Sequence, residues 1–272
     1  MVNLKPYEDV NFRGLRAIFG SKNGARHKRL LNAAPIIEAA CENYSRRRRT
    51  LARIVPLNLG GHRQRDLLHC YSSKTASLDE LKTNVHENQP DSVGQICQYC
   101  DITASRSIDH YLPQGEFEEF AVFSLNLVPA CKDCNNLKLE RWLKNGRRQF
   151  LSLYFDRLPR LRFLFATVYY VNGEFRSEFY LSPSRAVYEG MKGLVRSHFQ
   201  HLQLLQRYES AAGRELSENR EMAKRFARTH TQAETAQFLR DYAYSIRPAE
   251  SPNYWKSSLI EASSYCHEFC SP

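Results

Sequence analysis

The sequence lacks any run of about 18 apolar residues, the length that a membrane-spanning helix needs. It also lacks an apolar segment near its start, where residues 1–10 include Glu8 and Asp9. We therefore expect neither a membrane span nor a secretory signal. The chain contains no internal repeat and no long low-complexity segment. These absences favour a cytoplasmic protein that has no membrane partner.

The composition indicates a folded protein of more than one structural unit. Of the 272 residues, 42% are hydrophobic and 25% are charged, which is typical of globular rather than disordered chains. A chain of this length is long for a single compact core. We expect two or three units, with helical additions around a central domain.

Basic residues are concentrated in the first quarter of the chain. Residues 1–66 hold 14 Lys and Arg against 5 Asp and Glu, which accounts for most of the formal net charge of +10. Residues 1–29 mix these cations with Gly, Asn and Ser, so we expect an irregular basic arm there. Such a segment suits a polyanionic partner, because cations that neutralise phosphates release condensed counterions. The alternative is an ordinary solvated basic face.

The rest of the chain has mainly helical patterns. One helix is expected to start at Pro35 and another to cover residues 78–85. Residues 161–182 predict a β-hairpin, because Asn172-Gly173 favours a type I′ turn between alternating apolar and polar positions. Further helical stripes follow, with Gly213 as an expected break between two of them.

Eight cysteines are present, and four of them form two Cys-x-x-Cys pairs. The pairs, Cys97 with Cys100 and Cys131 with Cys134, are separated by thirty residues, a spacing typical of a structural zinc site. The alternatives are a coincidental set of buried cysteines or a redox pair, which would favour a βαβ context that this sequence does not predict. The segment 266–270 resembles half of a metal site, or else packs as a terminal helix.

The chemistry-bearing residues lie between and just after the cysteine pairs. A neutral His110 can accept a proton from water and so act as a general base. Asp109 and the side-chain oxygen of Asn135 are hard ligands suited to Mg²⁺ or Mn²⁺. The alternatives are that Asp109 caps a turn or pairs with an arginine, and that Asn136 replaces Asn135.

The stretch 97–138, about a sixth of the chain, resembles the HNH endonuclease family, also called ββα-metal or His-Me finger nucleases, in its four-cysteine zinc variant. The matching motifs are Asp109-His110, Asn126, and Asn135 followed by Lys138. The resemblance implies hydrolysis of phosphodiester bonds, in DNA rather than RNA, with Asn126 bracing the loop that orients His110. Many family members have His where Asn135 stands, although Asn is also a familiar version.

Together these expectations give an α+β fold, in which a small zinc-stapled ββα-metal nuclease core is embedded in a mainly helical chain with one additional β-hairpin. We expect a basic arm and helical region over residues 1–90, the nuclease module over 91–150, and the hairpin with a helical region over 151–272. Six arginines are candidate nucleic-acid contacts: Arg46, Arg47, Arg48, Arg49, Arg147 and Arg148. Arg147 and Arg148 are equally well explained as exposed helix positions.

Two other readings of the function stay open. The cysteines could instead build a non-catalytic zinc-ribbon module that binds nucleic acid or serves as an assembly subunit. The Asp-His-Tyr-Leu-Pro and Cys-Asn motifs also resemble nuclease subunits of bacterial anti-phage defence systems, which often work beside an ATPase. This second resemblance implies a protein partner for the helical C-terminal part.

Overall fold

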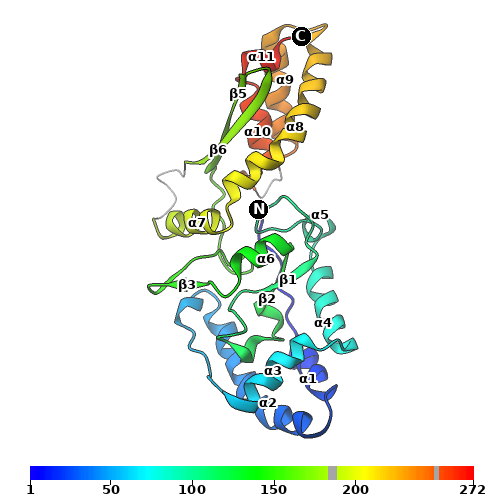
Figure 1. The fold of residues 1–272 in the computed structure, drawn as a ribbon, viewed down its shortest axis with the longest axis vertical. Helices are drawn as coiled ribbons and strands as arrows, with labels where there is room; N and C mark the ends of the chain where they lie inside the picture. Colours follow the sequence, from blue (N-terminus) through cyan, green and yellow to red (C-terminus); the bar gives the residue numbers. More distant parts are fainter. Residues whose placement is uncertain (183–188, 248–250) are drawn as a thin grey trace. The chain divides into compact units, whose positions relative to one another are not determined.

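The computed structural model describes residues 1–182, 189–247 and 251–272. They form two compact units (Figure 1). The described part of the chain is mainly helical, with three small two-stranded sheets, as the predicted α+β class requires. The N-terminal unit holds Asn3–Tyr99 and Thr103–Arg157, and the C-terminal unit holds Leu158–Pro272 with Met1–Val2 and Cys100–Ile102.

The N-terminal unit begins with four helices, which pack α1 against α2 and α4, and α2 against α3. Short 3-10 helices lie at Val10–Phe12, Leu51–Arg53, Glu118–Phe120 and Ser124–Asn126. The longer elements of this unit are α1 (Arg13–Gly20), α2 (Gly24–Arg47), α3 (Gly61–Ser72), α4 (Ala76–Glu87), α5 (Asp91–Gly94), β1 (Ser107–His110), β2 (Leu127–Ala130), α6 (Lys132–Lys138), β3 (Leu143–Lys144) and β4 (Arg147–Arg148).

The prediction of an irregular arm over residues 1–29 is wrong. Most of this segment is helical, because Leu15, Ile18 and Phe19 recur at helical spacing and are buried. The predicted helix start at Pro35 is also wrong, since α2 begins eleven residues earlier and Pro35 lies in its interior. Proline removes one backbone hydrogen bond there, and the buried apolar stripe that runs through α2 offsets that loss.

The centre of the N-terminal unit is a two-stranded hairpin followed by a helix. Strands β1 and β2 are antiparallel, with Ser107 opposite Ala130 and His110 opposite Leu127. All four residues of β2 are buried. Helix α6 follows directly and packs against β1 (Figure 1). This order places the end of β1 beside the first turns of α6.

The described residues of the C-terminal unit form a hairpin and five helices. The predicted hairpin is confirmed, with Asn172 and Gly173 at positive φ in its turn. Helix α8 runs through Gly213, so the predicted break there is wrong. The helices α8 and α10 pack against the hairpin. The elements are β5 (Leu164–Val171), β6 (Glu174–Leu181), α7 (Glu189–His201), α8 (Leu204–Ala227), α9 (Gln232–Ser245), α10 (Trp255–Ser263) and α11 (His267–Cys270).

Candidate functional site

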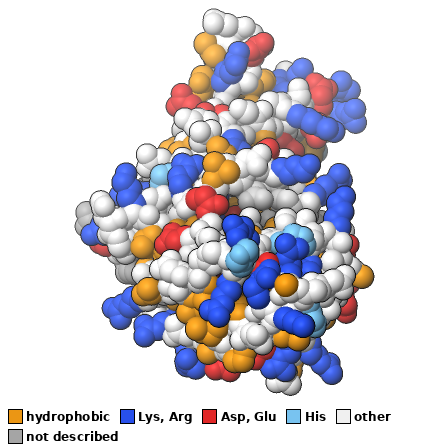
Figure 2. All heavy atoms as spheres, turned by 60° about the horizontal axis from the view of Figure 1, so that its bottom comes forward, with side chains coloured by type: hydrophobic (Ala, Val, Ile, Leu, Met, Phe, Trp, Pro, Cys, Tyr) orange, Lys and Arg blue, Asp and Glu red, His pale blue; other side chains and the backbone are white. Residues whose placement is uncertain are grey.

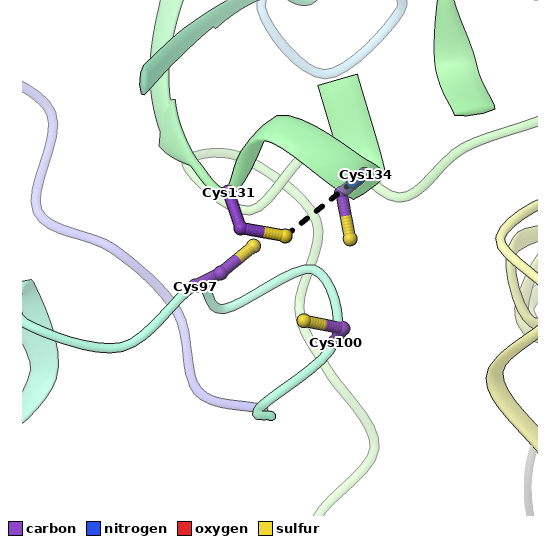
Figure 3. Close-up of side chains that lie close together, drawn as sticks. All are labelled: Cys97, Cys100, Cys131 and Cys134. Carbon is purple, nitrogen blue, oxygen red and sulfur yellow. Dashed lines mark hydrogen bonds between the residues drawn. The ribbon is translucent and has the colours of Figure 1, made fainter. Parts of the chain in front are cut away.

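The four cysteines of the two Cys-x-x-Cys pairs converge on one point (Figure 3). Their sulfur atoms all lie within 4.8 Å of one another, and all four residues are buried. Cys131 caps the start of α6, where its Sγ accepts a hydrogen bond of 3.4 Å from the backbone N–H of Cys134. Four thiolates around a tetrahedral zinc stand about 3.8 Å apart, given zinc–sulfur bonds of about 2.3 Å. The donor set therefore fits a structural zinc.

The other candidate residues meet at a cavity of about 510 Å³ in the N-terminal unit. Its lining includes Asp109 and His110 from the end of β1, and Asn135 and Asn136 from α6. The structure thus brings together three of the four predicted catalytic residues. Asn126, the fourth, does not line the cavity and lies behind it. The remaining lining residues are Tyr71, Lys82, His86, Arg106, Ser107, Ile108, Pro113, Gln114, Leu139 and Glu140.

His110 is held in a defined orientation. Its Nε2 lies 2.8 Å from the backbone carbonyl oxygen of Ala121. A carbonyl can only accept, so Nε2 carries the proton and the neutral ring keeps its lone pair on Nδ1. The Tyr71 ring packs edge-on against the imidazole at 4.3 Å. Burial lowers the pKa of His110 to about 4, and the nearby charges of Lys138 and Lys82 add to this effect.

Asn126 is fully buried and fixes the loop that follows β1. Its side-chain nitrogen donates to the carbonyl oxygens of Leu112 and Phe120, at 2.9 and 3.3 Å. Its side-chain oxygen accepts from the Leu112 backbone N–H at 2.8 Å. Phe120 directly precedes Ala121, the residue whose carbonyl orients His110. Asn126 therefore holds both ends of the loop that sets the direction of the imidazole.

Asp109 lies beside His110 but points into a buried polar network. Tyr99 donates to its Oδ2 at 3.0 Å, and the Lys138 ammonium donates to its Oδ1 at 3.2 Å. Lys138 is fully buried and also donates to the His110 carbonyl oxygen at 2.5 Å. Burial raises the pKa of Asp109, while the Lys138 charge and the two hydrogen bonds oppose that rise. The arginine partner that the sequence suggested is thus a lysine in the structure.

Asn135 is partly buried at the cavity wall. Its side-chain nitrogen donates a hydrogen bond to the Ile108 carbonyl oxygen at 3.3 Å, so the nitrogen end of the amide faces the protein. The side-chain oxygen is then the atom left to meet a ligand. Asn136 is exposed and also lines the cavity, so the alternative ligand identified from the sequence lies at the same site.

None of the six predicted arginine contacts lines this cavity. Arg46 to Arg49 are exposed at and beyond the end of α2, and two of them line a separate cavity. Arg147 is exposed, on a strand rather than a helix. Arg148 is partly buried and forms a two-pronged ion pair with Asp156, at 3.0 and 2.7 Å. Arg148 therefore has a structural partner in place of phosphate.

The cavity has cations that the sequence did not single out. Lys82 and His86 come from α4, and Arg106 precedes β1. On the face seen in Figure 2, Lys and Arg side chains with histidines among them gather on the N-terminal unit. A helix over residues 78–85 was predicted, but no local pattern connects it to the end of β1. Only the tertiary fold reveals these contributions.

Two further expectations concern metals and membranes. Among the described residues, the one metal-ligand cluster of His, Cys, Asp or Glu side chains is the four-cysteine group, and neither Cys266 nor Cys270 belongs to it. Within the described ranges, none of the helices is both long and apolar enough to cross a bilayer.

Comparisons with known proteins identify one relative. Protein ea31 of Escherichia phage lambda is 28% identical to this chain in an alignment of 190 positions that covers 65% of the chain and 64% of that protein. The match thus spans less than two thirds of the relative's length. No family model matches the chain. No solved structure matches it either. The name of that protein states no activity.

Proposed function

We propose that this chain is a metal-dependent endonuclease of the HNH type that hydrolyses phosphodiester bonds in nucleic acid. The observation that carries the proposal is the convergence of His110, Asp109 and Asn135 on one cavity, presented by a hairpin and helix in the β1–β2–α6 order. That order is the ββα-metal arrangement that the sequence resemblance implies. The four-cysteine cluster at the start of α6 supports the zinc variant.

In this proposal, His110 activates water. The Nε2–H group donates its hydrogen bond to the Ala121 carbonyl, so Nδ1 is the atom that can accept a proton from a water molecule in the cavity. The low pKa of the imidazole keeps it neutral, and hence able to accept a proton, at neutral pH. Asn126 maintains this geometry through the Leu112 and Phe120 carbonyls.

The oxygen atoms of Asp109 and Asn135 would hold Mg²⁺ or Mn²⁺. Both residues line the cavity, and a carboxylate oxygen that accepts one hydrogen bond keeps a second lone pair. A bound divalent ion would supply positive charge to the phosphate and to the leaving oxygen. Lys138 favours the ionised form of Asp109 and holds its carboxylate through a hydrogen bond of 3.2 Å.

The substrate is proposed to be DNA on the strength of the family resemblance, because phosphate contacts do not read the sugar. A place in bacterial anti-phage defence, beside an ATPase partner, rests on resemblance in the same way. A single site of this kind cuts one strand at a time, so nicking is the expected product.

The test is cleavage of supercoiled plasmid by purified protein with Mg²⁺, Mn²⁺ or EDTA. His110→Ala should lower cleavage by about 10²- to 10⁴-fold, because the general base is lost. Zinc content must stay equal to that of the unsubstituted protein. His62→Ala, which changes an exposed histidine in the same unit, is the control and should cleave normally. Full activity in zinc-replete His110→Ala would refute the assigned mechanism.

A second candidate function is a non-catalytic zinc module that binds nucleic acid or another protein. The buried Asp109–Lys138 pair favours it, because a carboxylate that already has an ammonium and a phenol as partners can serve structure alone. Nucleic-acid binding with no metal-dependent cleavage by any variant would support this reading.

A further inference from the structure

Two lysines with opposite surroundings lie near His110. Lys138 is fully buried and paired with Asp109 at 3.2 Å. Lys82 is half-buried at the cavity wall, and its ammonium has no carboxylate within 4.0 Å among the described residues. Lys138 therefore has its counter-ion in direct contact, whereas Lys82 forms no ion pair within the described ranges.

Lys82 is positioned by an aromatic ring that it shares with His110. Its Nζ lies 4.4 Å from the centre of the Tyr71 ring. The same ring centre is 4.3 Å from that of His110, so Lys82 Nζ can be no farther from the imidazole than the sum of these distances. A cation–π contact holds a lysine side chain in place without neutralising its charge. The cavity thus presents an oriented positive charge beside the imidazole.

The other residues of the cavity wall also favour the binding of an anion. Arg106 and His86 add two more basic side chains. Of the two acidic side chains in the lining, Asp109 is paired with Lys138, which leaves Glu140 at the rim. Partial burial lowers the pKa of Lys82, because the ammonium has lost water, and the charge of Asp79 on the same helix opposes this shift only in part. A bound anion would restore that missing stabilisation.

We infer that Lys82 binds a backbone phosphate of the nucleic acid, at or next to the phosphate that His110 faces. The ligand class is a phosphodiester, because the charge and the shared ring place the ammonium at the reacting group rather than at a base edge. The inference rests on the proposed function for its substrate, but it concerns binding and can be tested without cleavage.

The experiment measures binding of a short fluorescein-labelled DNA duplex by anisotropy without added Mg²⁺ or Mn²⁺, between about 50 and 200 mM salt. Lys82→Gln should weaken binding roughly fivefold and lower the slope of log affinity against log salt by about one, because one phosphate contact is lost. Lys82→Arg should restore both. Lys74→Gln, an exposed lysine between α3 and α4, is the charge-matched control and should behave like the unsubstituted protein.

The outcomes separate this inference from the nuclease proposal. An unchanged affinity and slope in Lys82→Gln overturn it, even if the protein cleaves DNA. An equal change in Lys74→Gln also overturns it, because the effect would then be one of general charge. A chain that does not bind the duplex overturns it as well. Binding that depends on Lys82, in a protein that cuts nothing, supports the phosphate contact and refutes only the hydrolysis.

Discussion

The two ends of α6 face different chemistry. At its start, Cys131 and Cys134 belong to a cluster of four buried sulfurs that could accept no further ligand once zinc is bound. From its second turn on, Asn135 and Asn136 border an open cavity together with oxygen and nitrogen atoms from β1. A closed sulfur site stabilises a fold, whereas an open site with hard ligands admits water and substrate. The difference makes the cavity, rather than the cysteine cluster, the candidate active site.

The two ends are nevertheless coupled through the helix itself. Cys134 and Asn135 are adjacent in sequence, so a metal bound by Cys134 would also restrict the position of Asn135. Lys138, one turn further on, returns to β1 through Asp109 and the His110 carbonyl. Helix α6 therefore links the stabilising cluster to the candidate active site over a distance of about two turns.

Loss of the metal should produce the largest effect. Cys131→Ala should lose its zinc and unfold the hairpin and α6, since structural zinc contributes on the order of 10 kcal/mol in small zinc domains. Zinc content and thermal unfolding followed by circular dichroism measure this. Cys70→Ala, at a buried cysteine outside the cluster, should keep its zinc and most of its stability. If Cys131→Ala retains its zinc and melts normally, the cysteine cluster at the start of α6 is not the stabilising zinc site, and the contrast with the cavity is lost.

A smaller but still large effect is expected from the lysine that links α6 to β1. Lys138→Met should lower the free energy of unfolding by about 3–5 kcal/mol, because it leaves the buried Asp109 carboxylate without its counter-ion. The combination of Lys138→Met with Asp109→Leu should recover much of that loss, since two apolar residues then replace the pair. Urea unfolding measures both variants.

The double variant also separates the structural role of Asp109 from its proposed role in cleavage. It should fold and bind zinc but cleave no DNA, because Asp109 is gone. Equal stability of Lys138→Met and the unsubstituted protein would show that the ion pair does not hold β1 to α6. Cleavage by the stable double variant would instead assign Asp109 a structural role alone.

Local sequence patterns were enough to predict several elements. The Asn172-Gly173 turn predicts its hairpin, because both residues tolerate positive φ and the flanking positions alternate. The two Cys-x-x-Cys pairs predict that the four cysteines meet at one site, because two pairs with this internal spacing are typical of zinc ligands. The resemblance of residues 97–138 to the HNH family implies that Asp109 and Asn135 share a site, and both line the same cavity.

The remaining features depend on contacts between distant segments. Tyr71 and Lys82 precede His110 by 39 and 28 residues, and no periodic pattern relates them to β1. The buried role of Lys138 was equally hidden, since a lysine on a short helix is usually solvated. The helix at residues 13–20 was missed for another reason. Its apolar spacing is present, but Gly, Asn and basic residues on either side suggested irregular structure.

The smallest expected difference between the cysteine cluster and the cavity at the two ends of α6 is how the stability of each region responds to pH. Zinc thiolates weaken on acidification, because protons compete with the metal. The loop beside the cavity should respond in the opposite direction. Glu119, two residues before Ala121, is buried, and its Oε2 has no hydrogen-bond partner in the described part of the chain. Burial raises the pKa of Glu119 from 4.5 to about 7.

A raised carboxyl pKa means that the folded state binds the proton more tightly than the unfolded state. The resulting stability is fully present below pH 4.5 and is lost as the pH rises through about 7. Glu119→Gln removes this titration, so between pH 5 and pH 8 it should gain about 2–3 kcal/mol relative to the unsubstituted protein. Urea unfolding at both pH values checks this, with the exposed Glu42→Gln as control. If the stability difference between Glu119→Gln and the unsubstituted protein does not vary with pH, the Glu119 carboxyl is solvated. The cavity loop and the cysteine cluster would then not differ in their response to pH in the way proposed.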